Sequence, residues 1–319
     1  MMRTSVVVPC FNEQEVIEET HKRLKSALSL LGDNFEIIYV NDGSKDCTFV
    51  KLVRIAAHDQ HVRVVSLSRN FGHQIALTAG LDYSTGDVTV IIDADLQDPP
   101  ELIQSMIQKW REGYKIVYGK RILRLGESTF KRITAKTFYK LLNLFSEVTI
   151  PTEAGDFRLL DKTVVADLRS MPERRRFIRG LTSWVGYPQY ALEYIREPRF
   201  AGRTKYTISR MIILALDGVL SFSTSPLRTA IWLGFATASL SFFGIIYAVV
   251  LRLLTSYWVS GWTLLFVSIM FIGGVQLIFL GVVGEYVGRI FHEVKARPLY
   301  FVAEVVGPCK EQPTANILE

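Results

Sequence analysis

The feature that most constrains this chain of 319 residues is a long apolar stretch near its C-terminal end. Residues 229–251 contain no charged side chain, and after Arg252 the next charge is Glu285. At ~1.5 Å per residue a helix over residues 229–251 is about 35 Å long, enough to cross a hydrocarbon core of about 30 Å. We predict one membrane span there and a second within residues 253–284. A buried helical hairpin is the alternative, but the chain is too short to cover two such helices.

The residues around these spans predict their orientation. The connector at 255–262 has no charge and is rich in the aromatic residues typical of a membrane interface. Positive charge lies on the other side, at Arg228 before the first span and at Arg289, Lys295 and Arg297 after the second. The positive-inside rule therefore predicts that both termini are cytoplasmic. Arg252 is an exception that lies close enough to the far surface for its long side chain to reach it.

The N-terminal part has a different pattern, in which short β-branched runs alternate with amphipathic stretches. Residues 5–8, 35–40, 62–67 and 88–92 have the character of buried parallel strands. Residues 16–31, 48–59, 72–82 and 101–112 have helical spacing, and Asp98 before Pro99 is typical of a helix start. This alternation predicts an α/β fold with an open, doubly wound sheet, which binds ligands beyond the carboxyl ends of its strands.

Composition narrows the possible partners and compartment. The net charge is +6, which fits a protein near an anionic membrane surface as well as one that binds nucleic acid. We find no recognition helix, zinc-finger spacing or RNA-binding aromatic motif, so we predict no nucleic-acid partner. The three cysteines are odd in number and far apart, which favours a reducing compartment over a disulfide framework.

The segment before the first span has an amphipathic pattern. Apolar residues fall at positions 208, 211, 212, 215, 219 and 222, which is the spacing of one helix face. Basic residues lie close by, at Arg203, Lys205 and Arg210. We predict a helix that lies in the headgroup region, with a core helix of the soluble domain as the alternative.

The strongest local motif is the acidic run DADLQDPP at residues 93–100, directly after a predicted strand. In extended chain, side chains two positions apart share a face, so Asp93, Asp95 and Gln97 can converge at the strand end. Two neighbouring carboxylates repel each other unless a cation lies between them, and a hard divalent cation meets this need while leaving positions for substrate phosphates. The alternative is a solvated acidic turn.

Two further motifs follow the first two predicted strands. They are PCFNE at residues 9–13 and NDGS at residues 41–44, and both lie where a nucleotide would bind in such a sheet. Helix capping by Asn12 or Ser44 is the alternative for each motif alone. The chain has neither a P-loop nor a well-placed dinucleotide-binding glycine motif.

In this order the motifs resemble those of glycosyltransferase family 2, and more narrowly those of the polyisoprenyl-phosphate glycosyltransferases. This group contains dolichol-phosphate mannose synthases and bacterial bactoprenol glucosyltransferases, and the resemblance covers about 290 residues. It rests on VVVPCFNE (6–13), VNDGS (40–44), RNFGHQ (69–74), DADLQDPP (93–100), GDFRL (155–159), RFIRG (176–180) and AGRTKY (201–206).

The resemblance implies a GT-A fold, a nucleotide-sugar donor, a polyisoprenyl-phosphate acceptor and inversion at the sugar. It implies the following roles: nucleotide binding by Pro9, Asn12, Glu13, Asp42 and Asp93; Mg²⁺ or Mn²⁺ binding by Asp93, Asp95 and Gln97; catalysis by Asp156, Asp95 and Arg158; acceptor-phosphate binding by Arg121, Arg132, Arg203 and Lys205. For each basic residue the alternative is a solvated charge or a contact with anionic headgroups.

These expectations combine into one description of the protein. A cytoplasmic GT-A catalytic domain spans residues 1–200, a juxtamembrane amphipathic region 201–227, two transmembrane helices 228–290 and a cytoplasmic tail 291–319. The two-span architecture favours glucose from UDP-glucose and a bacterial inner membrane, with GDP-mannose as the alternative donor. The oligomeric state stays open, a homo-oligomer included.

The charge of the acceptor shapes the expected mechanism. A lipid phosphate is already anionic at neutral pH, so the reaction needs no strong general base. We therefore expect Asp156 to orient the acceptor or reach the metal, while metal and arginines stabilise charge on the leaving diphosphate. A processive polysaccharide synthase is a rival, but its Q-x-x-R-W motif is absent. The rival of another class is a non-catalytic protein that binds nucleotide sugar or translocates a lipid-linked sugar.

Overall fold

The structure is a computed structural model that describes residues 2–32, 34–123, 154–174, 176–196, 225–254 and 261–308. The chain divides into two compact units. One comprises Met1–Asn143, Val148–Ile213 and Arg297–Glu319, and the other comprises Leu144–Glu147 and Leu214–Ala296. The amphipathic stretch at 208–222, together with Arg132, Arg203 and Lys205, lies outside the described residues.

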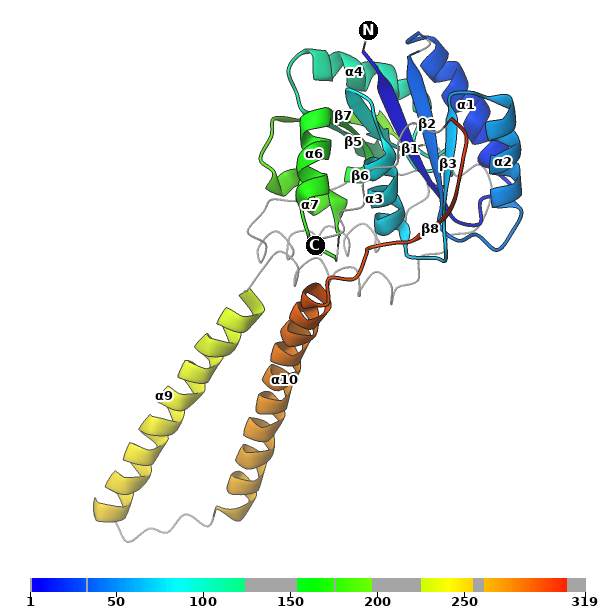
Figure 1. Ribbon diagram of the computed structural model, residues 1–319. Coiled ribbons are helices and arrows are strands. Elements are labelled where there is room, and N and C mark those ends of the chain that lie inside the picture. The colour runs from blue at the N-terminus through cyan, green and yellow to red at the C-terminus, as the bar shows by residue number, and fades with distance from the viewer. Residues whose placement is uncertain are drawn as a thin grey trace. The chain divides into compact units, whose positions relative to one another are not determined.

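The described part of the first unit is built on an eight-stranded mixed sheet with the order β7-β5-β6-β4-β1-β2-β3-β8 (Figure 1). The strands are β1 (Thr4–Cys10), β2 (Phe35–Asn41), β3 (Val62–Leu67), β4 (Val88–Ile91), β5 (Ile116–Leu123), β6 (Ala154–Asp161), β7 (Gln189–Ile195) and β8 (Val302–Val306). The four strands predicted from the sequence are confirmed as β1 to β4.

The strand directions bring the carboxyl ends of the parallel strands to one edge of the sheet. β1 pairs in parallel with β2 and β4, and β2 pairs in parallel with β3. β6 is antiparallel to both β4 and β5, and β5 is parallel to β7. The carboxyl ends of β1, β2, β4, β5 and β7 therefore lie at the same edge as the amino end of β6. We call this the carboxyl edge.

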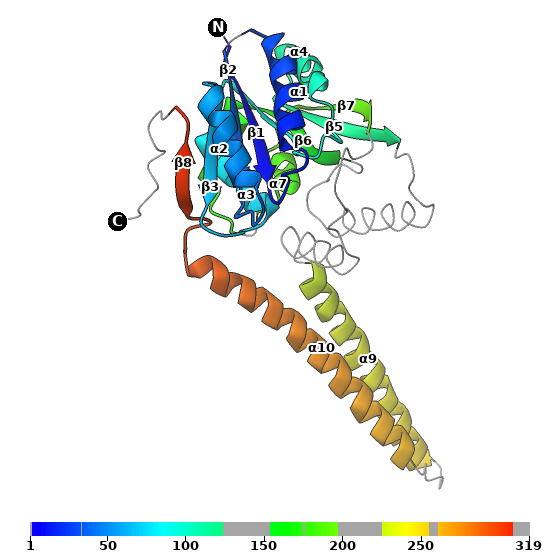
Figure 2. The same cartoon turned by 90° about the vertical axis from the view of Figure 1, so that its right-hand side faces the viewer.

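Helices cover both faces of the sheet (Figures 1 and 2). On one face α1 (Ile17–Ser29) contacts α2 (Thr48–His58), the short 3₁₀ helix η1 (Pro100–Leu102) and α4 (Ile103–Arg111). On the other face α6 (Lys162–Ser170) contacts α3 (His73–Tyr83) and α7 (Ile178–Trp184). The predicted α/β fold, a GT-A fold with a Rossmann-like mixed sheet flanked by helices, is confirmed: β6 and β8 run antiparallel to their neighbours.

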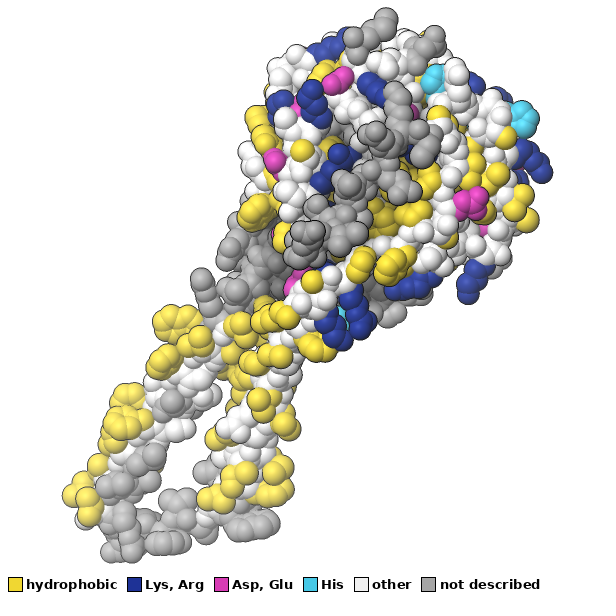
Figure 3. All heavy atoms as spheres, viewed as in Figure 1, with side chains coloured by type: hydrophobic (Ala, Val, Ile, Leu, Met, Phe, Trp, Pro, Cys, Tyr) yellow, Lys and Arg dark blue, Asp and Glu magenta, His cyan; other side chains and the backbone are white. Residues whose placement is uncertain are grey.

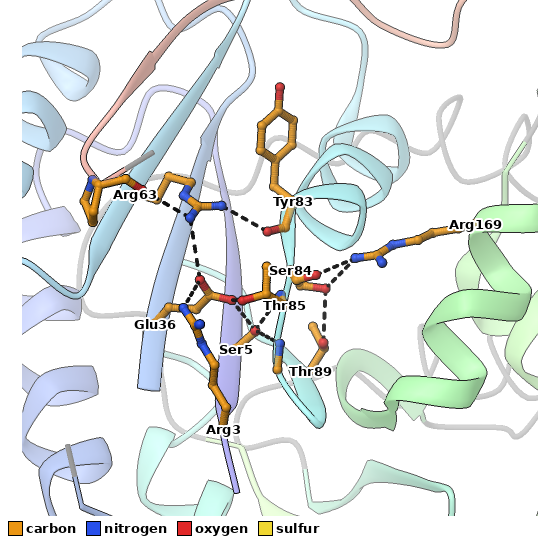
Figure 4. A network of polar contacts seen from close by, with 11 residues as sticks. Arg3, Ser5, Glu36, Arg63, Tyr83, Ser84, Thr85, Thr89 and Arg169 are labelled. Carbon is orange, nitrogen blue, oxygen red and sulfur yellow. Dashed lines mark hydrogen bonds and ion pairs between the residues drawn. The ribbon is translucent and has the colours of Figure 1, made fainter. Parts of the chain in front are cut away.

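The core lies between the sheet and these helices. Every residue of β1, β2, β3 and β4 is buried, as expected for parallel strands covered on both faces. At the opposite edge from the carboxyl ends, Glu36 of β2 joins several elements (Figure 4). Its carboxylate accepts hydrogen bonds from Arg3, Ser5 and Thr85. This network ties β1 and β2 to the turn before β4.

The C-terminal segment returns to the first unit, whereas residues 291–319 were predicted to be a tail. β8 pairs antiparallel with β3, and the backbone N–H of Ser68 donates to the carbonyl of Phe301 at 2.9 Å. The hydroxyl of Tyr300 donates to Asp82 of α3 at 2.9 Å. Hydrophobic and β-branched residues at 302–306 make this pairing favourable along the edge of β3.

The described part of the second unit contains two long apolar helices, α9 (Ser225–Leu254) and α10 (Trp262–Val294), which contact each other. Hydrophobic side chains cover much of their visible surface (Figure 3). One helical segment in the described residues, Ser268–Val294, is long and apolar enough to cross a membrane, and none of its most apolar window is buried. Within α9 the apolar segment Thr229–Gly244 is shorter than that criterion requires.

Candidate active site

The loops after β1 and β2 are joined to each other at the carboxyl edge. Asn12 accepts a hydrogen bond from the backbone N–H of Lys45 at 2.8 Å, and its own N–H donates to the hydroxyl of Ser44 at 3.0 Å. The N–H of Glu13 donates to the hydroxyl of Thr48 at 2.8 Å. Neither Asn12 nor Ser44 caps a helix, because the caps of α1 and α2 are Val16 and Cys47. The two loops therefore form one rigid rim, beside Pro9 at the end of β1.

Asp42 holds a third loop against this rim. Its two carboxylate oxygens accept hydrogen bonds from the backbone N–H groups of Phe71 at 2.7 Å and Gly72 at 3.0 Å. Its carbonyl accepts from the side-chain amide of Asn70 at 3.2 Å. Asp42 is only 2% exposed, so its carboxylate orders the loop that leads into α3. A direct contact with a nucleotide stays a prediction.

The acidic run after β4 forms a tight turn. The backbone N–H of Gln97 donates to Asp95 at 3.1 Å, and Leu96 between them has a φ of 58°. That left-handed conformation is unfavourable for leucine and marks a constrained turn. Burial raises the pKa of Asp93 to about 6, and the charges of Asp156, Asp98 and Asp95 add to this effect. The turn concentrates negative charge at one point.

Asp156 lies near the amino end of β6 and has partners on two helices. Arg179 of α7 donates two hydrogen bonds to its carboxylate, from Nε to Oδ1 at 2.8 Å and from Nη2 to Oδ2 at 2.9 Å. His73 of α3 lies on its other side, with Nε2 at 3.2 Å from Asp156 and 3.6 Å from Asp93. Although burial opposes ionisation, Arg179 and His73 hold the pKa of Asp156 well below its usual range.

His73 carries positive charge between two carboxylates. Burial lowers its pKa, but the hydrogen bond that it donates to Asp156 and the charges of both aspartates outweigh burial and raise that pKa to about 9. His73 thus supplies part of the cationic charge that was predicted to come from a metal ion. Neither His73 nor Arg179 was predicted as a site residue. The motifs RNFGHQ and RFIRG contain them, but no local pattern shows that they meet at Asp156.

Arg158 and Arg121, two predicted site residues, are both largely buried. Arg158 is 3% exposed and donates to the hydroxyl of Thr182 and, at 2.9 Å, to the carbonyl of Gly155. Arg158 therefore stabilises the backbone next to Asp156. Arg121 donates to the hydroxyl of Tyr194 at 3.2 Å, and its Nη2 is 3.5 Å from the buried carboxylate of Asp98.

The donor set at Asp93 fits a divalent cation only in part. Among the described residues no group of three or more His, Cys, Asp and Glu side chains is arranged to hold a metal ion. However, Oδ1 of Asp93 is buried and has no hydrogen bond there. Mg²⁺ commonly uses one or two carboxylates and completes its shell with water and substrate phosphates. Asp93 and Asp95 match that pattern, with Gln97 two positions further on.

The sheet order arranges these residues in sequence along the carboxyl edge. The rim loops follow β2 and β1, the acidic turn follows β4, Asp156 lies near the amino end of β6, and Arg121 lies near the carboxyl end of β5. In the order of the strands, Asp156 therefore lies between the acidic turn and Arg121.

Comparisons with known proteins identify the family of this chain. Residues 5–169 match the family described as Glycosyl transferase family 2. The chain is 46% identical over 303 residues to "Uncharacterized glycosyltransferase YkcC" of Bacillus subtilis (strain 168), covering 95% of this chain and 94% of the relative. It is 44% identical over 301 residues to "Bactoprenol glucosyl transferase" of Shigella phage SfII, covering 94% and 97%.

A third relative is "Prophage bactoprenol glucosyl transferase homolog" of Escherichia coli (strain K12), with 43% identity over 304 residues, which covers 95% of this chain and 99% of the relative. This chain is a glycosyltransferase and belongs to glycosyltransferase family 2. The resemblance to the polyisoprenyl-phosphate glycosyltransferase group, first seen in its motifs, is confirmed.

Proposed function

We propose that this glycosyltransferase transfers a hexose from a nucleotide sugar to a polyisoprenyl phosphate at the cytoplasmic face of the membrane. The favoured donor is UDP-glucose, since relatives over 94% of the chain are bactoprenol glucosyl transferases by name. The observation that carries the proposal is the placement of Asp156. Its carboxylate accepts hydrogen bonds from Arg179 of α7 and from His73 of α3, which is 83 residues away in the sequence. A protein that only binds a nucleotide sugar does not need this group of charged residues in addition to the nucleotide-binding rim.

The proposed reaction assigns the two halves of the carboxyl edge to the two substrates. The rim around Asn12, Glu13 and Asp42 binds and orders the nucleotide, and the turn at Asp93 and Asp95 lies beside its diphosphate. The acceptor phosphate approaches from the β5 and β7 side. Asp156 then lies between donor and acceptor.

Asp156 acts in this reaction as a fixed anion and does not remove a proton. Its pKa is held well below the usual range by Arg179 and His73, so its carboxylate is a weak base. The acceptor phosphate needs no base, because it already carries negative charge. The fixed carboxylate instead orients the sugar and stabilises the positive charge that develops at the anomeric carbon.

A divalent cation, Mg²⁺ or Mn²⁺, would be held by Asp93 and Asp95, with Gln97 nearby, and would stabilise charge on the leaving diphosphate. His73 lies between Asp93 and Asp156, and its positive charge offsets the repulsion between the two carboxylates. We propose that donor and acceptor bind on opposite sides of β6, and that the acceptor attacks from the side opposite the leaving group. Such an attack gives inversion at the sugar, which is the outcome that the family resemblance implies.

The second unit supports a membrane location. The segment Ser268–Val294 can cross a bilayer, and we propose α9 as a second span that brings both ends of the pair to the same face. Arg289, Lys295 and Arg297 follow the apolar part of α10, which supports a cytoplasmic face for that end. The lipid phosphate lies at the same surface.

The test is transfer by the full chain in detergent, with radiolabelled UDP-glucose or GDP-mannose and a polyprenyl phosphate. We expect labelled lipid from UDP-glucose, and about a 100-fold lower turnover for Asp156→Asn. Asp167→Asn is the matched control, because Asp167 bonds to Tyr187 at 2.7 Å and has no part in the site. Labelled lipid from GDP-mannose alone would establish the other donor, and no lipid product from either donor would contradict the proposal.

A further inference from the structure

The first turn of α3 is joined to the start of α7 by Gln74, a side chain that the proposed reaction does not use. Gln74 follows His73 on α3, and its Oε1 accepts a hydrogen bond from the backbone N–H of Ile178 at 2.9 Å. Ile178 is the first residue of α7 and is completely buried. The two helices lie side by side (Figures 1 and 2), although Gln74 and Ile178 are 104 residues apart in the sequence.

This hydrogen bond takes the place of a helix cap. The first N–H groups of a helix have no partner within the helix, so a buried one needs an acceptor from elsewhere. Phe177, the residue before α7, has no side-chain oxygen and forms no cap hydrogen bond. Gln74 supplies the acceptor for Ile178 instead, and the next residue of α7 is Arg179. Gln74 therefore fixes the end of α7 from which Arg179 reaches Asp156.

Other side chains hold α7 further along. Arg158 donates a hydrogen bond to the hydroxyl of Thr182, and the side-chain amide of Gln189 donates to the carbonyl of Thr182 at 2.9 Å. A helix of seven residues that is held at both ends has little freedom to shift or to rotate. The contact from Gln74 is the one beside Arg179, so its loss should move that side chain most.

The start of α3 is in turn fixed by the nucleotide-binding rim. Asp42 accepts a hydrogen bond from the N–H of Gly72, which is the N-cap of α3 and has a φ of 101°, a conformation that favours glycine. His73 and Gln74 follow directly. One helical turn therefore carries a direct partner of Asp156, which is His73, and the residue that holds the other partner through α7.

We propose that Gln74 is a positioning residue for Asp156, and that it acts by holding Arg179 in the orientation that its two hydrogen bonds require. This inference rests on the proposed function, because it assigns Gln74 to the reaction through the carboxylate between donor and acceptor. A guanidinium group that donates two parallel hydrogen bonds to one carboxylate needs a fixed position as well as a charge. A small shift of α7 would keep the charge nearby but break one of the two bonds.

The first test compares three variants of the full chain in detergent. Gln74→Met keeps the length and helix propensity of the side chain but removes the acceptor, whereas Gln74→Glu keeps an acceptor oxygen. Gln189→Met is the matched control, because it also removes one side-chain hydrogen bond to α7, but at Thr182. The readouts are kcat, the KM for each substrate, the dissociation constant for UDP and the melting temperature.

For Gln74→Met we expect kcat to fall about tenfold, with both KM values and UDP binding within about twofold of the wild type. Gln74→Glu should restore most of kcat, and Gln189→Met should lower the melting temperature but keep kcat. A lower melting temperature for Gln74→Met with unchanged kcat would show a merely structural role and overturn the proposal, as would an equal loss of kcat in Gln189→Met. If Gln74→Met does not fold, Gln74→Ala is used, and unchanged kcat there would overturn the proposal equally.

A double-mutant cycle tests whether Gln74 acts through Arg179. In Arg179→Met the guanidinium is absent, so the addition of Gln74→Met should lower kcat by less than about twofold. A further tenfold loss would show that Gln74 acts by another route and would overturn the proposal.

The same cycle in melting temperature needs no turnover, so the proposed function and this inference can fail separately. Non-additive shifts in a protein that transfers no sugar would refute the function and retain the link between Gln74 and Arg179. Additive shifts in such a protein would refute both.

Discussion

Replacing Arg179 with methionine removes both hydrogen bonds that α7 contributes to the Asp156 carboxylate, at 2.8 and 2.9 Å. Methionine keeps an unbranched apolar stem of similar reach, so the main change is the loss of the guanidinium. The variant leaves Asp156 with His73 as its remaining cationic partner among the contacts described above, next to the negative charge of Asp93.

The expected magnitude follows from burial. Removing one partner of a buried ion pair costs about 3–5 kcal/mol. Asp156 is only 6% exposed, but Arg179 is 22% exposed, so water screens part of the interaction and the lower end applies. This cost of about 3 kcal/mol is a loss of folding stability. For kcat we expect a loss of roughly 100-fold, because the carboxylate at the reaction centre is no longer held in position. The pKa of Asp156 should rise at the same time, since its main counter-charge is gone.

The assay compares kcat, KM for each substrate and the dissociation constant for UDP in the wild type and Arg179→Met. We expect the loss in kcat, with UDP binding within about twofold of the wild type, because the rim loops at β1 and β2 do not involve α7. Arg54→Met, an exposed arginine on α2, is the control. Unchanged kcat in Arg179→Met, or a collapse of UDP binding, would refute the account of Asp156 as a fixed anion.

Three further predictions concern stability. Gly43→Ala should lower the free energy of unfolding by at least ~1 kcal/mol, because φ is +62° and a Cβ would be 2.4 Å from a backbone carbon of the loop after β3. Gly32→Ala, with φ +98° but open space, should cost less in the same denaturant titration. Burial raises the pKa of Asp59, but hydrogen bonds, including one from Lys25, outweigh burial and lower this pKa to about 2. Asp59 therefore stabilises the fold above about pH 4, and this contribution is lost as pH falls toward 2; Asp59→Asn should flatten that slope in melting temperature, and parallel profiles would contradict it. Glu36→Gln should lower the melting temperature without changing UDP affinity, since its network lies at the other edge of the sheet; a matching loss of UDP affinity would contradict this separation.

The sequence predicts the first four strands and their helices well, because buried parallel strands have continuous β-branched runs and the helices between them are amphipathic. It does not predict the strands on the acceptor side. β6 contains the charged residues Asp156, Arg158 and Asp161, and they interrupt the hydrophobic pattern by which a buried strand is predicted. β8 joins the sheet from the far end of the chain, and only tertiary pairing with β3 defines it.

The candidate site shows the same division. The sequence locates Asp93 and Asp95 from their positions after a predicted strand, whereas Asp156 is located through the family resemblance. The partners of these residues come from distant segments: His73 is 83 residues from Asp156, and Tyr194 is 96 residues from Asp98. Asn12 and Ser44 could be assigned to helix caps from local sequence, yet they bond across two loops, because their strands are neighbours in the sheet.

The most direct test of the account is the anomeric configuration of the lipid product. We propose that the acceptor phosphate and the leaving diphosphate lie on opposite faces of the sugar ring, so that the attack inverts the anomeric carbon. With UDP-α-glucose and a polyprenyl phosphate, proton NMR of the purified product should show a β-linked glucosyl phosphate. An α-linked product would show that the sugar configuration is retained and would contradict the proposed arrangement of the two substrates.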